Sequence, residues 1–543
     1  MSISSFPGIF ESLLQERGIL PAEREIFLNP DYSRLHDPLL LPDMAKARDR
    51  VIKAVQNGEH IIVFSDYDAD GIPAAVVLSD LFKRIGYTNI SFYIPHRHDE
   101  GYGLNIDAIG EISLRGAKVM ITLDCGITDT EEVKLANERG IDVIITDHHE
   151  PHDELPAAFA IVNPKRKDSI YPFSGLCGSG VAFKLVQAIL NKESFGVKPG
   201  MEKWSLDMVG IATLSDMVPL VDENRILARF GLEVLRKSPR PGLSSLFNKL
   251  NLKREHLTED DVAFMITPRI NAASRMGVPK DAFDLLSTTD QVEGDRLADH
   301  LEKINQERKG VVASMVKAAK AELKKRESLG SVIVIGNPEW KPSLLGLVCN
   351  SLVEEHSRPV FVWGRDGDGQ LKGSCRSYNG YDLVMLMEGA KESFIEYGGH
   401  KGAGGFSITL EKLTTLENKL SQALKKISSD NEIEQKGLNI SLGDVTEGLW
   451  QVVSQFAPFG TGNEKPVFKI KNAPITSIKT FGKENNHLEI SLPNGLKAIS
   501  FFSTPESYKL EATSSSCTLH AHLEKSYFRN RPELRLRIVD IEM

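Results

Sequence analysis

The sequence has few cysteines and no long apolar run. None of its five cysteines in 543 residues pairs with another as CxxC, which gives no indication of a zinc knuckle or a disulfide framework. The first twenty residues mix acidic and basic side chains with apolar ones, and no later stretch reaches the length of a membrane span. We therefore expect a cytoplasmic protein with no membrane segment.

An excess of positive charge is also missing. Proteins that bind nucleic acid over much of their surface usually contain a basic domain, and the formal net charge of −9 argues against one. A local basic groove remains compatible with this value, because net charge averages over faces that never meet the ligand. An apolar fraction of 41% is typical of a globular protein. The length predicts roughly three or four domains.

Three aspartates follow the first apolar strand that the sequence predicts. Asp66, Asp68 and Asp70 lie between the β-branched run 61–63 and a predicted helix that begins at Gly71. This loop would stand at the carboxyl end of a strand, where open α/β sheets bind ligands. Close carboxylates repel one another unless cations lie between them, and oxygen ligands favour Mg²⁺ or Mn²⁺. An isolated DxDxD would indicate only a solvated acidic turn.

Similar strand ends recur downstream. Asp124 and Asp147 each end a predicted strand, His148 and His149 follow directly, and Asp216 closes an apolar helical segment. The carboxyl ends of parallel strands meet at one edge of a sheet, so these side chains should converge. Convergence of this kind favours a metal site over a chance distribution of acids.

The chain is expected to fold as five consecutive parts. Alternating strands and helices predict a parallel, doubly wound sheet, and a long proline-free helical period follows it. We predict two α/β lobes joined by a long helix, followed by a C-terminal OB-type β-barrel of about five strands. The expected parts are an N-terminal helical cap (1–57), a first lobe (58–289), a connecting helix (290–328), a second lobe (329–427) and the barrel (437–543).

Several polar positions suit an anionic ligand. Arg269, Asn271 and Arg275 in ITPRINAASRMG fit a phosphate or carboxylate, although surface arginines on a capped helix would give the same pattern. A glycine-rich turn near His400 would let a ligand approach the backbone, although such a turn is more often a hairpin. On the barrel, four lysines would form a basic face or serve solubility: Lys469, Lys471, Lys479 and Lys483.

The motifs DYDADG, LDCG, TDHH, SDMVPL and GGHKGAGGF, in this order and spacing, resemble the DHH phosphoesterase superfamily. The likeness covers nearly the whole chain and is strongest to the branch of single-strand-specific exonucleases. It implies a site for two Mn²⁺ or Mg²⁺ ions in the first lobe and a DHH-associated second lobe that holds DNA. It also implies 5′-to-3′ hydrolysis of single-stranded DNA to mononucleotides in DNA repair and recombination. A monomer is expected, with a single-strand-binding protein or a helicase as candidate partners.

The resemblance also assigns roles to individual residues. The implied metal ligands are Asp68, Asp70, Asp124, His148 and Asp216. Three further residues are implied to be catalytic: Asp66, Asp147 and His149. Of these, His149 would lie near the scissile phosphate or act as the proton donor. The 5′-terminal phosphate would be held by Arg275, Ser374 and Arg376, and His400 would lie against the substrate backbone.

Three positions depart from the family pattern. Pro73-Ala74 stands where a hydroxyl residue usually follows DADGI, and Ser274 replaces a frequent glycine. Trp340-Lys341 stands where a tryptophan-histidine pair is common, with Ser343 in place of glycine. None of these departures removes an implied metal ligand, so they bear on DNA contacts and rate.

Two other functions compete with the exonuclease. A DHH phosphodiesterase that acts on short oligoribonucleotides or cyclic dinucleotides would share the chemistry, but such enzymes resemble the two lobes alone. An inactive DHH-like replication scaffold would have lost its acids, whereas this chain keeps them.

Overall fold

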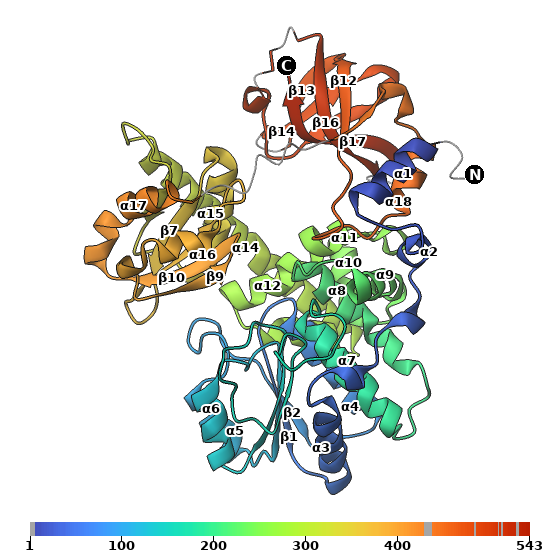
Figure 1. Cartoon of the computed structure of the whole chain (residues 1–543), viewed down its shortest axis with the longest axis vertical. Helices are drawn as coiled ribbons and strands as arrows, with labels where there is room; N and C mark the ends of the chain where they lie inside the picture. Colours follow the sequence, from blue (N-terminus) through green and yellow to red (C-terminus); the bar gives the residue numbers. More distant parts are fainter. Residues whose placement is uncertain (1–5, 428–436, 483–484, 509, 512–513, 528–531) are drawn as a thin grey trace.

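The computed structural model describes residues 6–427, 437–482, 485–508, 510–511, 514–527 and 532–543. The chain folds into two α/β lobes and an OB-type barrel, which confirms the predicted fold class (Figure 1). In Figure 1 the first lobe lies at the bottom, the second at the left and the barrel at the top.

The first lobe is built on a parallel sheet with strand order β2-β1-β3-β4-β5. Its strands are β1 (Ile61–Ser65), β2 (Ile90–Tyr93), β3 (Val119–Leu123), β4 (Asp142–Thr146) and β5 (Ala160–Val162). Alternate side chains of β1 pack into two separate hydrophobic cores, one on each face of the sheet. Val63 packs with α3 (Met44–Asn57), α4 (Gly71–Arg84) and α7 (Gly178–Lys192). Phe64 packs on the other face with α5 (Ile106–Leu114) and α6 (Thr130–Glu138).

The rest of the first lobe is helical. Its helices are α8 (Leu206–Ser215), α9 (Asp222–Lys237), α10 (Pro241–Lys249), α11 (Glu259–Asp261), α12 (Thr267–Met276) and α13 (Lys280–Ser287). The π-helical turn η6 (Val262–Ile266) joins α11 to α12, so residues 259–276 form one continuous helical rod. This rod begins beneath the barrel and ends where the two lobes face each other (Figure 1).

A single long helix, α14 (Gln291–Leu323), leads to the second lobe. The mixed sheet of that lobe has the order β6-β7-β8-β10-β9. Its elements are β6 (Ile333–Gly336), α15 (Pro342–His356), β7 (Val360–Arg365), β8 (Leu371–Arg376), α16 (Leu383–Glu388), β9 (Glu396–His400), β10 (Ala403–Ile408) and α17 (Leu410–Leu424). The glycine-rich stretch is the hairpin of β9 and β10, as its alternative interpretation predicted.

The barrel contains a seven-stranded sheet in the order β11-β12-β16-β17-β15-β14-β13, where about five strands were expected. Its elements are β11 (Leu438–Ile440), α18 (Glu447–Ser454), β12 (Phe468–Pro474), β13 (Ser477–Phe481), β14 (His487–Ser491), β15 (Lys497–Ser500), β16 (Ser516–Ser526) and β17 (Glu533–Glu542). Two of the predicted basic residues form ion pairs within the barrel, Lys469 with Glu542 and Lys479 with Glu489. Lys483 lies outside the described residues.

The predicted N-terminal cap divides between two cores. Helix α1 (Pro7–Glu16) packs on the barrel, where the rings of Phe10 and Phe456 lie 5.6 Å apart. Arg17 strengthens this contact, since its Nε donates to Asn463 Oδ1 at 2.7 Å. Helix α3 instead packs on the first sheet. Figure 1 shows α1 beside the barrel and α3 at the opposite end of the molecule.

Arg225 on α9 fastens the barrel to the first lobe. Its side chain is almost fully buried, with Nε donating to Phe27 O at 2.8 Å and Nη1 to Phe456 O at 2.9 Å. The guanidinium carbon also lies 3.8 Å from the Phe27 ring centroid. One cation therefore joins the lobe, the N-terminal segment and the barrel.

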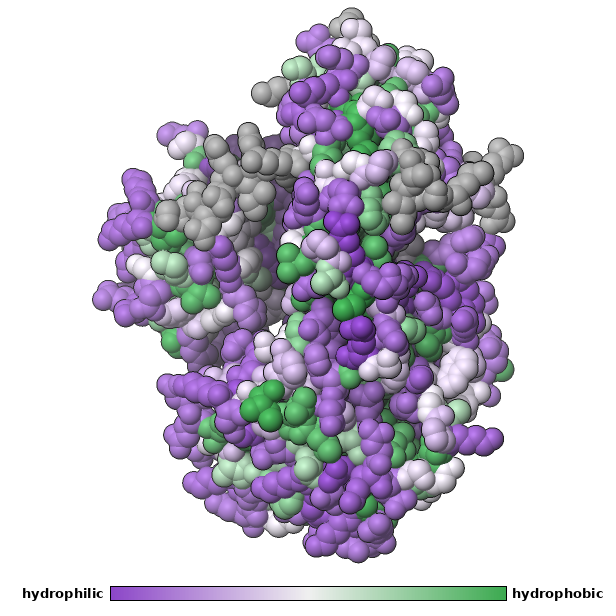
Figure 2. Space-filling view, turned by 45° about the vertical axis from the view of Figure 1, so that its right-hand side comes forward, coloured by the Kyte–Doolittle hydropathy of each residue, from purple (hydrophilic) through white to green (hydrophobic). Residues whose placement is uncertain are grey.

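Within the described residues, no helix is long and apolar enough to cross a membrane. On the face drawn in Figure 2, hydrophobic residues form small patches among hydrophilic ones. No single extended apolar surface is visible from this side.

Candidate metal centre and phosphate site

The loop after β1 supplies the first acids of the site. Asp68 Oδ1 accepts from the backbone N–H of Asp70 at 2.8 Å and of Gly71 at 3.2 Å, at the start of α4. Asp66 is buried, and its Oδ1 has no hydrogen-bond partner among the described residues. Gly71 is required here, because a Cβ at this position would come 2.4 Å from Asp66 O.

Asp124 follows β3 in a strained backbone conformation. Its φ is +62°, in the left-handed region that non-glycine residues rarely adopt. The side chain is buried, and Oδ1 accepts no hydrogen bond among the described residues, although His148 Nε2 lies 3.1 Å away as an ion-pair contact. Strain and an unpaired buried oxygen at one residue are typical of a functional position.

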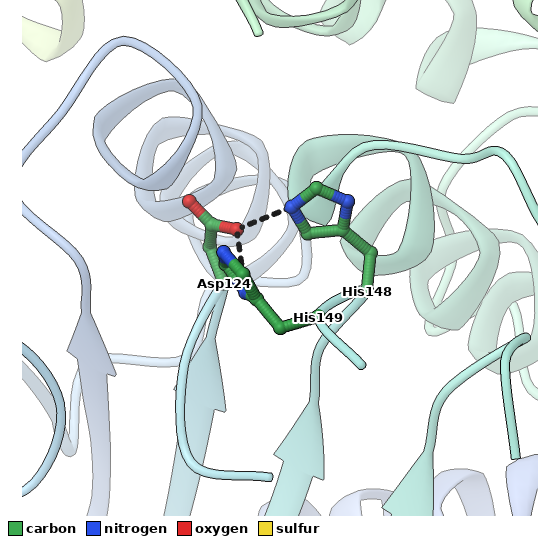
Figure 3. A group of neighbouring side chains, drawn as sticks. All are labelled: Asp124, His148 and His149. Carbon is green, nitrogen blue, oxygen red and sulfur yellow. Dashed lines mark ion pairs between the residues drawn. The ribbon is translucent and has the colours of Figure 1, made fainter. Parts of the chain in front are cut away.

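The carboxylate of Asp147 orients the second histidine. Its Oδ1 accepts from His149 Nδ1 at 2.8 Å and from the backbone N–H of His148 at 2.7 Å, while Oδ2 accepts from Ile127 N at 3.0 Å. Both oxygens of Asp147 are therefore occupied, and one of them holds the His149 ring. Figure 3 shows His148 and His149 approaching Asp124 from adjacent positions of one loop.

His148 lies at the centre of the acids. Its Nε2 is 3.1 Å from Asp124 Oδ1, 3.6 Å from Asp216 Oδ2 and 3.8 Å from Asp70 Oδ2. Burial, followed by the charge of His149, lowers the pKa of His148 to about 3. The ring is therefore neutral, as a metal ligand must be.

The N-terminus of α7 completes the site. Asp70 accepts from the backbone N–H of Gly178 at 2.6 Å and of Ser179 at 2.7 Å. A Cβ on Gly178 would come 2.6 Å from Asp124 Oδ1. Only glycine therefore allows the helix to approach both carboxylates, and this explains one glycine of the segment before α7.

Like charges in a buried site raise the carboxyl pKa values. Burial, followed by the charge of Asp68, raises the pKa of Asp70 to about 6. Burial and then the charge of Asp70 raise the pKa of Asp216 to about 8. The pKa of Asp124 also rises well above its ordinary value, from burial and then from Asp70. Cations placed among these oxygens would offset the repulsion.

The donor set fits divalent metal ions. Three groups of ligand atoms each lie within 4.8 Å of one another: Asp66, Asp68 and Asp124; Asp70, His148 and Asp216; Asp124, His148 and His149. Unpaired buried oxygens on Asp66 and Asp124 are the atoms that an ion would satisfy. These groups contain the five residues predicted as ligands and, in addition, Asp66 and His149.

A second cluster consists of arginines where the two lobes meet. Arg275 Nη1 donates to Ser343 O at 2.5 Å, and Ser343 Oγ donates to Arg275 O at 3.2 Å, joining α12 to α15. Burial lowers the pKa of Arg275 to about 10, and three nearby guanidinium groups act in the same direction: those of Arg97, Arg308 and Arg376. In the described parts of the chain, no ion pair joins any of these four arginines to a carboxylate. Such a cluster suits an anion.

The other residues predicted to bind substrate lie on both lobes, in different surroundings. Ser374 and Arg376 lie on β8, where Arg376 Nη1 donates to Cys375 O at 2.8 Å. Asn271 Oδ1 accepts from Ala69 N at 3.0 Å, which ties α12 to the first acidic loop. Arg269 is buried and forms an ion pair with Glu302 at 2.8 Å. His400 is exposed at the end of β9.

Three residues near the site were missed at the sequence level. Tyr102 donates to Asp124 O at 3.2 Å, and its hydroxyl lies 3.1 Å from His149 Nδ1. Arg97 stands over the Tyr67 ring at 4.8 Å, and Arg308 bonds Asn305 Oδ1 at 2.9 Å from α14. The motif PHRHDEGYGLN, which contains Arg97 and Tyr102, was the available signal.

Comparison with known proteins divides the chain into three matched regions. Residues 60–213 match the DHH family, N-terminal domain, and residues 329–426 match the DHHA1 domain. Residues 438–540 match the RecJ OB domain. The single-stranded-DNA-specific exonuclease RecJ of Salmonella typhimurium is 31% identical, over 79% of this chain and 78% of the relative. The chain belongs to the RecJ family.

Two further relatives agree. The RecJ exonuclease of Bacillus subtilis is 34% identical over 89% of this chain. This chain spans 61% of the length of that relative. The crystal structure of RecJ from Thermus thermophilus in complex with Mn²⁺ superposes with a TM-score of 0.81 at 25% identity, covering all of this chain and 78% of that one. The lobes and the barrel are therefore arranged as in a solved RecJ.

Proposed function

We propose that the protein is a metal-dependent exonuclease that hydrolyses single-stranded DNA from the 5′ end to mononucleotides, in DNA repair and recombination. The observation that carries this proposal is the convergence of buried acids and His148 beside four arginines that have no carboxylate partner in the described residues. Membership of the RecJ family supports the substrate class. The Mn²⁺ complex of the Thermus thermophilus relative supports a divalent ion.

The arrangement assigns a task to each group. Divalent cations, when bound, lower the pKa of water and neutralise charge on phosphoryl oxygens. Two ligand groups share no residue, namely Asp66, Asp68 and Asp124 on one side and Asp70, His148 and Asp216 on the other, which supports two ions. Asp147 holds His149 through Nδ1 and leaves Nε2 for a contact with the scissile phosphate.

Direction must come from a group that recognises one chain end, because a metal centre alone hydrolyses any phosphodiester presented to it. A terminal phosphate carries more negative charge than an internal one, and guanidinium groups bind it through charge-assisted hydrogen bonds. Arg376 from the second lobe is near enough to Arg275 of the first lobe that its charge lowers the pKa of Arg275. We assign the 5′-terminal phosphate to this cluster, with Arg97 and Arg308 as additional cations.

The competing functions have less support. A phosphodiesterase for oligoribonucleotides or cyclic dinucleotides would not need the barrel that matches the RecJ OB domain. An inactive scaffold would not need the buried, mutually repelling acids of the ligand groups. Beyond DNA, we propose a single-strand-binding protein or a helicase that presents single strands as a partner, with the protein acting as a cytoplasmic monomer.

Product patterns test the proposal. Single strands labelled at the 5′ or the 3′ end are incubated with the protein and Mn²⁺, beside a blunt duplex and an EDTA control. Immediate release of a labelled mononucleotide from the 5′-labelled strand, with progressive shortening of the 3′-labelled one, is expected. The duplex and the EDTA sample should remain intact. Digestion from the 3′ end, or without metal, would contradict the proposal.

Replacing Arg376 should weaken end recognition. In Arg376→Ala the preference for 5′-phosphorylated over 5′-hydroxyl strands is expected to fall by about tenfold, since a hydrogen bond to a charged group contributes about 1.5–3 kcal/mol. The measurement is kcat/KM on both strands. Lys372→Ala is the matched control, because it removes a half-exposed cation from the same strand β8. An unchanged preference in Arg376→Ala would remove this residue from the end site.

A further inference from the structure

An exposed aromatic side chain stands on the rod that connects the barrel to the metal centre. Phe264 lies in the π-helical turn η6, and 62% of its surface is exposed. Exposure of a large ring on a helix has no packing benefit, and π-helical turns are frequent at functional sites. This turn belongs to the first lobe and not to the barrel, so the barrel fold does not determine where Phe264 lies.

The barrel presents an arginine to this ring. The guanidinium carbon of Arg537, on β17, lies 6.0 Å from the Phe264 ring centroid and 5.0 Å from that of Phe501. Arg537 also lies 3.7 Å from Glu524, on the neighbouring strand β16. The three groups Phe264, Arg537 and Phe501 thus form an aromatic–cation–aromatic series across the junction of lobe and barrel.

The series continues over the barrel surface as further rings. His487 lies 5.4 Å from Phe501 and 4.9 Å from Phe502, which is 80% exposed. Phe481 is 5.1 Å from His487. Two of the barrel lysines, Lys469 and Lys479, are paired with glutamates. Exposed rings beside arginines are the chemistry that binds unpaired bases by stacking.

The rod fixes how far this series is from the reaction. Phe264 and Arg275 are eleven positions apart on one continuous helix, which corresponds to about 16 Å at 1.5 Å per residue. Asn271, between them, bonds Ala69 in the acidic loop. At about 3.4 Å per stacked nucleotide, this separation equals about five nucleotides. A strand whose end lies in the arginine cluster would therefore reach Phe264 only beyond its first few nucleotides.

We propose that Phe264, with Arg537 and Phe501, is a base-stacking step that holds single-stranded DNA where it passes from the barrel to the metal centre. This inference rests on the proposed function and adds a binding residue from the first lobe. The rings of Phe481, His487 and Phe502 extend the same track outward. The occupant is a single strand with unpaired bases, because a duplex hides its base faces in the stack.

The length of the DNA substrate distinguishes a loss of base stacking at Phe264 from a general effect on the enzyme. For a strand of about twenty nucleotides, Phe264→Ala should raise KM about tenfold with kcat unchanged, since one stacked base contributes appreciably to affinity. For a 5′-phosphorylated dinucleotide, which cannot reach the ring, both constants should equal those of the wild type. Phe264→Trp should retain wild-type KM, and Phe264→Leu should behave as alanine does.

The control is Leu114→Ala, which removes an 89% exposed apolar side chain at the far end of α5. It should leave KM unchanged for both substrates. An unchanged KM of Phe264→Ala on the long strand, or an equal rise on the dinucleotide, would overturn the inference. Failure of the wild type to bind or hydrolyse either substrate would instead show that the proposed function is wrong.

Discussion

Asp124→Asn is expected to reduce kcat for single-stranded DNA by about a thousandfold, equivalent to about 4 kcal/mol of transition-state stabilisation. Asp124 belongs to two of the three ligand groups, and its buried Oδ1 accepts no hydrogen bond among the described residues. Asparagine keeps the side-chain shape and tolerates the left-handed backbone at this position, so the change removes charge and leaves the loop intact. Single-turnover hydrolysis in Mn²⁺ measures the loss.

The same variant should respond differently to metal. Ions that bind only the folded wild-type protein raise its melting temperature, and this rise should be much smaller for Asp124→Asn. Without metal, the variant should melt at or above the wild-type temperature, because one of several repelling buried carboxylates is gone. Asp107→Asn, at an exposed position on α5, is the matched control and should resemble the wild type. Wild-type turnover by Asp124→Asn would exclude this residue from the metal centre.

Gly178→Ala is expected to lower kcat by about a hundredfold, because an error of about 1 Å in the position of a reacting group has an effect of this size. The new Cβ would come 2.6 Å from Asp124 Oδ1, so either the carboxylate or the start of α7 must move. A move of α7 would also break the hydrogen bonds of Asp70 with Gly178 and Ser179. Steady-state kinetics over a range of Mn²⁺ concentrations measures both turnover and metal affinity.

Gly180→Ala provides the comparison for that variant. It lies two residues later in α7, and its nearest neighbour would be Leu176 Cδ2 at an ordinary 3.4 Å. Alanine should therefore fit, and it should stabilise the helix by up to about 1 kcal/mol relative to glycine. Equal activity of the two alanine variants would show that the contact of Gly178 with Asp124 has no influence on the metal centre.

The acidic residues of the metal centre could be predicted because they lie at the ends of strands. A strand that ends in aspartate is visible in the sequence, and parallel topology brings such ends together without further information. Asp66, Asp124 and Asp147 follow β1, β3 and β4 as expected. The convergence of His148 on three carboxylates is a consequence of this order.

The arginine cluster where the two lobes meet could be predicted only in part. Arg97 comes from a loop after β2 and Arg308 from the middle of α14, and only tertiary structure brings them near Arg275. Arg269 and Arg275 lie on one helix, and a sequence motif cannot tell which of the two has a carboxylate partner. Glu302, which pairs with Arg269, lies 33 positions away on another helix.

The contact of α1 with the barrel has a consequence for how the chain is made. The apolar face of α1 leaves the ribosome well before its partners, such as Phe456 and Leu449, which follow more than four hundred positions later. At roughly 5–20 residues per second, the helix waits about 20–90 seconds for them. During this interval Phe10, Leu13 and Leu14 are open to chaperones and to other nascent chains. Translation speed and chaperone supply should therefore influence the yield of native protein through the N-terminal helix more than through the metal-binding lobe.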